Sequence, residues 1–438
     1  MTESHFTTLP LLVTDGICEH LALADILSLR LVSRTFTPPP HVMRTCFEHR
    51  STDLTEQSLL TLGMIAAHPY FGGLVRSLTV VAQAYDDRII RDNLRSQESW
   101  ESNQVYDQRI EMWSPRAKDI QNLQTEQSYM TNSGRDVELL AAALTNLPSL
   151  KTVDIDVNIA KLTGSQRFAD SSPSSPRYRN VVWPQTHHAF SVLLAALAQS
   201  GSQPKTLHPL RSMRGGIHVD LCHFHQVAST LQNEHARHSL SRLRDLSLGL
   251  ANPGSCPSAT PCSALDPASC DVNCAIGTKA LLSGCAETLE TLVLSWYLVQ
   301  PRPTHGILSF FTAFSTLNFS ALRECTIRGL AIETDAFLDF LARVPKLQRL
   351  SLSHLTLFPI AEASEAWRPV FEGLVGPTRR AVGLQKLEMS YLRSSGDIFF
   401  GPSTLSVGLD GDSIHTRPGT GLEGSLSWSS VWSIYQDS

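Results

Sequence analysis

A short apolar pattern recurs along the chain after residue 50: a Leu, two variable residues, an apolar residue, one variable residue and a second apolar residue. Apolar residues two positions apart point to the same face of a strand, and the Leu three positions earlier can pack the turn that leads in. Each copy therefore predicts one short strand that is buried on one face. A weaker copy covers 74–80, and six are clear: Leu150–Val153–Ile155, Leu243–Leu246–Leu248, Leu289–Leu292–Leu294, Leu322–Cys325–Ile327, Leu347–Leu350–Leu352 and Leu384–Leu387–Met389.

Helical patterns precede several of these copies, at residues 137–147, 279–287 and 335–344. A unit of helix, turn and strand cannot bury its apolar face alone, so neighbouring units have to stack against one another. The pattern predicts an α/β fold in which residues 49–392 form an irregular solenoid similar to leucine-rich repeats. The long interval between Leu150 and Leu243 is expected to hide one or two further units.

Three stretches interrupt the repeats and are expected to be insertions, at about 92–134, 163–184 and 252–275. The second contains SSPSSP and predicts a loop. Residues 393–438 are rich in Gly and Ser and predict a mobile C-terminal tail. The first insertion is polar and rich in Gln, and its candidates to anchor an irregular helix are Trp100, Trp113 and Tyr129.

The N-terminal segment, residues 9–36, predicts two short helices before a run of three prolines at 38–40 that ends helix formation. The first helix places Val13, Ile17 and Leu21 on one face. The second, from about Asp25 to Ser33, is apolar on nearly every side. A short helix of this kind has to be covered, either by its own chain or by a partner protein.

The same segment resembles an F-box. The matching features are a Leu-Pro start, an Ile and a Leu four apart, an acidic residue that opens the second helix, and the run LRLVSRTF at 29–36. This form is similar to the one common in filamentous fungi, where a leucine-rich-like body often follows. The resemblance implies that residues 1–48 form an F-box-like helical domain that docks on a Skp-type adaptor and, through it, on a cullin scaffold. The adaptor-binding residues that it implies are Leu9, Pro10, Ile17, Leu21, Leu29 and Val32.

Composition narrows the range of partners. Lys and Arg number 36 against 41 Asp and Glu, for a formal charge of −5, and no basic stripe is visible along the sequence, which argues against nucleic acid as the main partner. The first residues do not resemble a secretory signal, and no stretch approaches the roughly 20 apolar residues of a membrane span. The nine scattered Cys make a poor disulfide framework. We therefore expect no membrane association and a cytoplasmic or nuclear location.

Three groups of residues resemble sequence motifs of metal or dinucleotide sites, but each lacks a feature that such a site requires. One cysteine group lacks the tight CxxC pair typical of zinc sites, and a His and Cys group lacks an HExxH pattern. A GxGxxG match at 419–424 has no strand before it and no helix after it. The sequence therefore predicts no catalytic residue, no metal and no cofactor. The two groups are Cys256, Cys262, Cys270, Cys274 and Cys285, and His218, Cys222, His223 and His225.

The leading hypothesis is a non-enzymatic substrate receptor of an SCF-type, cullin–RING ubiquitin ligase, which binds the adaptor through its first helices and a protein substrate through its repeats. The alternative is a scaffolding repeat protein with no link to ubiquitin ligase, whose N-terminal helices cap the open end of the repeat stack. An enzyme would need a deep pocket with converging titratable groups.

Overall fold

A computed structural model of the chain describes residues 11–21, 25–26, 28, 40–85, 118–119, 121–161, 164–167, 176–209, 219–220, 231, 234–251, 267–297, 311–358, 367, 369–370, 372–374, 383–390, 392–394, 397–398, 405–410, 413–416 and 425–426.

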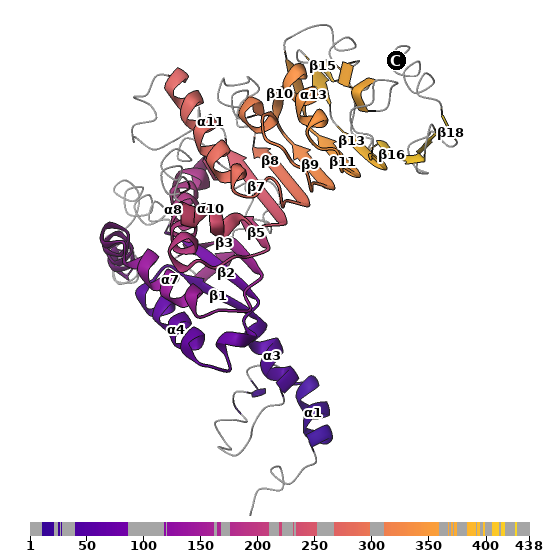
Figure 1. Cartoon of the computed structure of the whole chain (residues 1–438). Helices are drawn as coiled ribbons and strands as arrows, with labels where there is room; N and C mark the ends of the chain where they lie inside the picture. The colour runs from indigo at the N-terminus through magenta and orange to yellow at the C-terminus, as the bar shows by residue number, and fades with distance from the viewer. Residues whose placement is uncertain are drawn as a thin grey trace, which may run out of the picture.

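Nine parallel strands form the centre of the described part of the chain, and each pairs with the next in the order β1, β2, β3, β5, β7, β8, β9, β11, β13 (Figure 1). The predicted α/β class is confirmed. The strands are β1 (His49–Asp53), β2 (Ser77–Tyr85), β3 (Thr152–Lys161), β5 (Thr206–Pro209), β7 (Asp245–Ala251), β8 (Thr291–Tyr297), β9 (Glu324–Arg328), β11 (Arg349–Ser353) and β13 (Lys386–Ser390).

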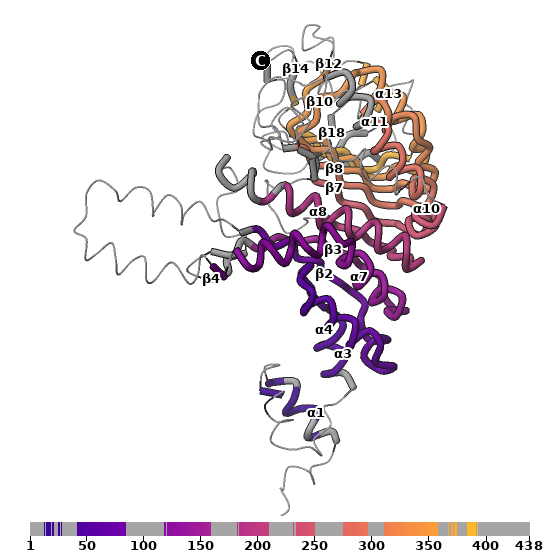
Figure 2. The backbone as a smooth tube through the Cα atoms, turned by 90° about the vertical axis from the view of Figure 1, so that its left-hand side faces the viewer, coloured from indigo at the N-terminus to yellow at the C-terminus, as the bar shows by residue number. Residues whose placement is uncertain are grey.

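In the described part of the chain, helices cover one side of this sheet and none covers the other, which is called the open side below (Figures 1 and 2). The predicted helices at 137–147 and 335–344 are confirmed as α7 and α13, while the one predicted at 279–287 is the end of a longer helix, α11. The helices of this layer are α4 (Glu56–Ala67), α7 (Arg135–Thr145), α8 (Pro176–Ser200), α10 (Glu234–Leu240), α11 (Pro267–Ser283) and α13 (Thr334–Ala342).

Several smaller elements lie beside the strands of the main sheet. A 3-10 turn, η2 (Gly72–Leu74), leads into β2, and two short strands, β4 (Gly164–Arg167) and β6 (Val219–Asp220), pair with β3 and β7. A second sheet consists of β10 (Ala331–Glu333), β12 (Thr356–Phe358), β14 (Arg393–Ser394) and β15 (Asp397–Ile398). Within 393–438, the predicted tail, β16 (Leu405–Asp410) pairs antiparallel with β13 and is followed by β17 (Ser413–Thr416) and β18 (Ser425–Leu426).

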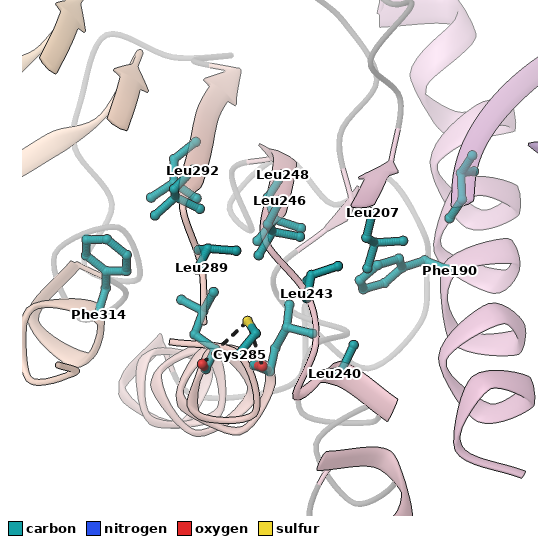
Figure 3. Packing of buried hydrophobic residues seen from close by; sticks show 14 of the residues in the cluster. Phe190, Leu207, Leu240, Leu243, Leu246, Leu248, Cys285, Leu289, Leu292 and Phe314 are labelled. Carbon is teal, nitrogen blue, oxygen red and sulfur yellow. Dashed lines mark hydrogen bonds between the residues drawn. The ribbon is translucent and has the colours of Figure 1, made fainter. Parts of the chain in front are cut away.

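The register explains why the apolar pattern recurs. Successive residues along each strand alternate between the helix side and the open side, and residues aligned across neighbouring strands share a side. The two apolar positions of each copy therefore line up in two rows beneath the helices. These rows belong to one continuous hydrophobic core, in which the leading Leu of each copy also packs (Figure 3). Cys285 lies among the leucines of β7 and β8, and its thiol donates to the carbonyl oxygens of Leu281 and Leu282.

One backbone contact repeats at the entry to the parallel strands from β2 onward. The residue just before each strand offers its carbonyl oxygen to two N–H groups of the next unit: Arg76 accepts from Lys151 at 2.8 Å and Thr152 at 3.0 Å, and Lys151 accepts from Lys205 and Thr206 at the same two distances. The same pair of bonds continues to the unit of β13. Basic residues hold this entry position in four consecutive strands, so a short basic row does exist, contrary to expectation; it consists of Arg76, Lys151, Lys205 and Arg244.

Two strands of the main sheet escaped prediction because few of their inward positions are leucines. In β5, the unit hidden between Leu150 and Leu243, the buried positions are Pro204, Leu207 and Pro209. In β1 the inward positions are half-buried Arg50 and buried Thr52, which align with Leu78 and Val80 of β2. The weak copy at 74–80 is also shifted by one residue, since fully buried Val75 occupies the leading position.

The expected insertions contain more regular structure than predicted. The loop predicted at 163–184 is wrong in part, since these residues include β4 and the start of α8. Pro176 is the first residue of α8, a position where the backbone N–H that proline lacks would have no partner within the helix. Pro267 starts α11 in the same way, inside the insertion predicted at 252–275. Residues 121–133 are helical, but Tyr129 does not anchor them, because its side chain is 65% exposed while neighbouring Met130 is buried. Trp100 and Trp113 lie outside the described residues.

Candidate functional site

The N-terminal helices form a small apolar cluster of their own, separate from the main core. Helix α1 (Leu11–Glu19) packs against α3 (Pro40–Glu48), a helix that the sequence did not predict because the proline run ends at the first residue of a new helix. The buried members of this cluster, called the hook cluster below, are Cys18, Ile26 and Val42, with Leu21 and Cys46 packed against them.

The apolar face of α1 is covered on one edge only. Around the helix, Ile17 follows Val13 at about 40° and Cys18 follows Ile17 at about 100°, since each residue turns the helix by roughly 100°. Leu21 comes just after the end of α1. Cys18 is only 2% exposed, Leu21 and Ile17 are intermediate, and Val13 is 46% exposed. The side of α1 that carries Val13 and Ile17 therefore faces away from the hook cluster. Of the predicted adaptor-binding residues, Ile17 and Leu21 are described, whereas Leu9, Pro10, Leu29 and Val32 lie outside the described residues.

Helix α3 joins the hook cluster to the body. The ring of Phe47 stacks on Phe71 with 4.4 Å between ring centroids and an interplanar angle of 8°, and Arg50 of β1 lies over the Phe47 ring at 5.5 Å. Figure 1 shows α1 beyond α3, away from the sheet. The ring contacts that attach the hook cluster to the body thus involve α3, whereas the exposed Val13 lies on α1.

A polar hollow of about 440 Å³ lies on the open side of the sheet, where β1, β2 and β3 end. Most of the lining side chains belong to outward-facing positions that the strand register aligns: Ser51 with Thr79, Asp53 with Val81 and Asp156, and Gln83 with Asn158. Thr52, Ser58 and Val157 complete the lining. Sequence reasoning missed this hollow, because its residues come from segments as far apart as 51 and 158.

A directed set of hydrogen bonds runs through the hollow toward Asp53. The side-chain amide of Asn158 donates to Gln83 Oε1 at 3.1 Å, and Gln83 Nε2 donates to Asp53 Oδ2 at 3.3 Å. The other carboxylate oxygen of Asp53 accepts from the backbone N–H and the hydroxyl of Thr55, just before α4. These contacts hold the Asp53 carboxylate at a fixed place on the wall of the hollow.

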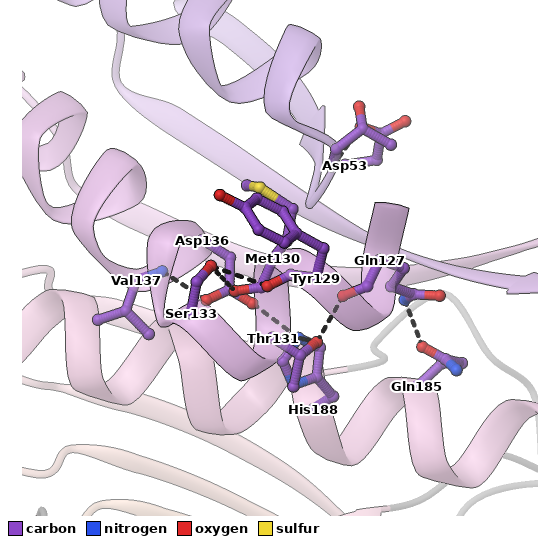
Figure 4. A network of polar contacts seen from close by, with 11 residues as sticks. Asp53, Gln127, Tyr129, Met130, Thr131, Ser133, Asp136, Val137, Gln185 and His188 are labelled. Atoms are coloured by element: carbon purple, nitrogen blue, oxygen red, sulfur yellow. Dashed lines mark hydrogen bonds and ion pairs between the residues drawn. The ribbon is translucent and has the colours of Figure 1, made fainter. Parts of the chain in front are cut away.

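Two His–Asp contacts also bring titratable groups together in the described part of the body. On the open side, His208 lies between two carboxylates, with its Nε2 3.1 Å from Asp245 and its Nδ1 3.7 Å from Asp154. Between the helices, His188 Nε2 lies 2.9 Å from Oδ2 of Asp136, which is only 1% exposed, and 3.2 Å from the hydroxyl of Thr131 (Figure 4). The second contact ties residues 121–133 to α7 and α8, which is a structural role.

Most of the chemical motifs of the sequence lie where the structure gives no side chains. Cys285 is the exception: it is buried in the core, and burial raises the pKa of its thiol to about 12. Within the described residues, no group of three or more His, Cys, Asp and Glu side chains is placed to hold a metal ion. Nor is any helix in the described part long and apolar enough to cross a membrane. The remaining members of both groups, and the match at 419–424, fall outside the described side chains.

No family model matches the chain, and no curated protein matches it.

Proposed function

We propose that the chain is the substrate-recognition subunit of an SCF-type, cullin–RING ubiquitin ligase, with no catalytic activity of its own. In this proposal the N-terminal helices bind a Skp-type adaptor, the body holds a protein substrate, and the protein works in the cytoplasm or nucleus. The observation that carries it is the half-open apolar face of α1, where Val13 and Ile17 lie outside the chain's own clusters. Burying a side chain of this size stabilises a complex by roughly 1.5–3 kcal/mol.

We further propose that the body is an irregular leucine-rich-repeat-like solenoid. The support is that each strand pairs with the next strand in chain order and that the same two backbone bonds join consecutive units. Contacts between neighbouring units alone are what a stack of repeats requires. The polar open side of such a stack is the natural place for a substrate, because the helices occupy the other side.

The scaffold alternative retains one observation in its favour. The Phe47–Phe71 stack fixes α3 against the body, as a cap on the first repeat would. A capping role of α3 and an adaptor-binding role of α1 use different residues, so the cap alone does not decide between the two functions.

Co-purification with a Skp-type adaptor tests the ligase proposal. The full chain is co-expressed with the adaptor as wild type, as Val13→Asp and as the double variant Ile17→Asp with Leu29→Asp. Val13 is exposed, so its variant is expected to fold normally, as judged by circular dichroism, yet to lose adaptor at least tenfold. His20→Asp introduces the same residue at an exposed position beside the same helix and is expected to retain it.

The outcomes separate the hypotheses. Wild type that never co-purifies with the adaptor, or a Val13→Asp variant that binds as well as wild type, would leave the scaffold as the better account. Loss in both variants with retention in His20→Asp supports adaptor binding through α1.

A further inference from the structure

The hollow at the ends of β1, β2 and β3 has an anionic lining. Among the described lining residues, Asp53 and Asp156 contribute carboxylates, the other polar side chains are neutral amides and hydroxyls, and none is Lys or Arg. Asp side chains are negatively charged near neutral pH. A ligand that fills the hollow is therefore expected to bring a positive charge.

The hydrogen bonds around Asp53 lead to the same conclusion. Its described partners, Thr55 and Gln83, are neutral donors, so they satisfy its hydrogen bonding without neutralising its charge. A guanidinium can bind a carboxylate through two parallel charge-assisted hydrogen bonds, which neutral donors such as Thr and Gln do not provide. A guanidinium or ammonium group in the hollow would supply that charge, with the oxygens of the neighbouring amides and hydroxyls as further acceptors.

The size and chemistry of the hollow favour an organic cation over a metal ion. Its volume, about 440 Å³, lies in the range of roughly 300–1,000 Å³ typical of sites for small organic ligands, far more than one ion needs. Among the described residues, no three metal-ligating side chains converge here or elsewhere. The long side chain of Arg or Lys fits such a site, with its apolar stem against the outward-facing Val81.

We propose that this hollow binds a lysine or arginine side chain from an extended segment of the protein substrate. The inference rests on the proposed receptor function, since it names the class of segment that the open side recognises. The backbone of that segment crosses the outward-facing rows of Ser and Thr beside the hollow, while one basic side chain enters it and meets Asp53 and Asp156.

A library of random decapeptides displayed on their own messenger RNAs tests this site with the full chain as bait. Selection is run on wild type, on Asp53→Asn and on Asp156→Asn. Each Asn keeps the side-chain oxygen that accepts from the backbone, from Thr55 in one case and from Val157 in the other, so the fold is expected to persist. Glu287→Gln, at an exposed position outside the hollow, removes one negative charge as a matched control.

Wild type and Glu287→Gln are expected to select peptides with Lys or Arg enriched at one position, and the two Asp variants to bind those peptides at least tenfold more weakly. Replacing that residue by citrulline, which keeps the shape of Arg without its charge, is expected to cause the same loss. The proposal is overturned by selected peptides without a basic position, by binding that survives the Asp variants, by equal binding of the citrulline peptide, or by the absence of any selected peptide. It is also overturned if free arginine competes as well as the peptide, since the ligand would then be a small molecule.

Adaptor co-purification of the same Asp variants separates the two proposals. Retained adaptor with lost peptide locates the defect in substrate recognition. If wild type itself does not co-purify with the adaptor, the ligase proposal is refuted, and this result says nothing about what the hollow binds.

Discussion

The turn after β9 provides a sharp test of the fold, because Gly329 has two independent reasons to be glycine. Its φ is +76°, a backbone conformation that costs an L-residue roughly 1–2 kcal/mol. A Cβ at this position would also lie 2.2 Å from the backbone oxygen of Trp296, at the end of the neighbouring β8. We therefore predict that Gly329→Ala forces the turn away from Trp296 and weakens the bond from Gly329 N–H to the Ser353 carbonyl, 2.9 Å long.

The expected loss can be worked from these terms. The left-handed backbone contributes about 1–2 kcal/mol and the disrupted hydrogen bond about 1 kcal/mol, before any cost of moving the turn. Gly329→Ala should thus lower the free energy of unfolding by about 3 kcal/mol or more. The measurement is urea denaturation followed by circular dichroism, with the shift of the midpoint converted through the slope.

Two other glycines serve as controls that separate strain from collision. Gly201 has a φ of +65° at the end of α8 but nothing within 4 Å of its Cβ position, so Gly201→Ala should cost only about 1–2 kcal/mol. Gly63 lies inside α4 with open space and no positive φ, so Gly63→Ala should stabilise by about 0.5–1 kcal/mol. Equal effects of Gly329→Ala and Gly201→Ala would refute the close approach of β9 to β8.

Two further predictions concern buried groups. His188→Ala leaves the buried Asp136 carboxylate without its imidazole partner and should lower the free energy of unfolding by about 1–3 kcal/mol in the same assay. Arg135→Ala, which breaks an exposed ion pair, should lower it by at most about 1 kcal/mol. The reverse order would contradict the contact between His188 and Asp136. Burial raises the pKa of Cys285 to about 12, so iodoacetamide at pH 8 should label Cys46 well before Cys285 in the native chain, with site occupancy read by mass spectrometry. The thiol of Cys285 ionises near pH 9 in the unfolded chain and only near pH 12 in the folded chain. The contribution of Cys285 to the free energy of unfolding is therefore present below pH 9 and is lost as the pH rises toward 12. Cys285→Ala should not show this loss.

The repeating strands could be predicted from the sequence wherever the inward positions carry Leu, Ile, Val or Met. The pattern failed where other residues meet the same geometric need: Pro204 and Pro209 in β5, and Arg50 in β1, the end strand with a neighbour on one side only. At the weak copy, Leu74 and Val75 are equally apolar, so composition alone could not fix which of them leads the strand. Strand register, which is a property of the assembled sheet, decides it.

The candidate sites differ in how far the sequence could reveal them. The apolar face of α1 depends on residues within one helix, so helical spacing alone could place Val13 and Ile17 on it. Leu21, predicted on the same face, lies beyond the end of the helix at Glu19. The hollow depends on β1, β2 and β3 being neighbours in register, although more than 60 residues separate β2 from β3 in the chain. No local pattern carries that information. The basic row at the strand entries was hidden for the same reason.

Amide hydrogen exchange of the full chain, measured with and without a purified Skp-type adaptor, tests the central claim most directly. The account predicts that the adaptor slows exchange in peptides covering α1, whose Val13 and Ile17 face becomes covered, while exchange in β7 and β8 is unchanged. Exchange in α1 that stays the same at saturating adaptor would contradict the claim that this helix face is built to be covered by another protein.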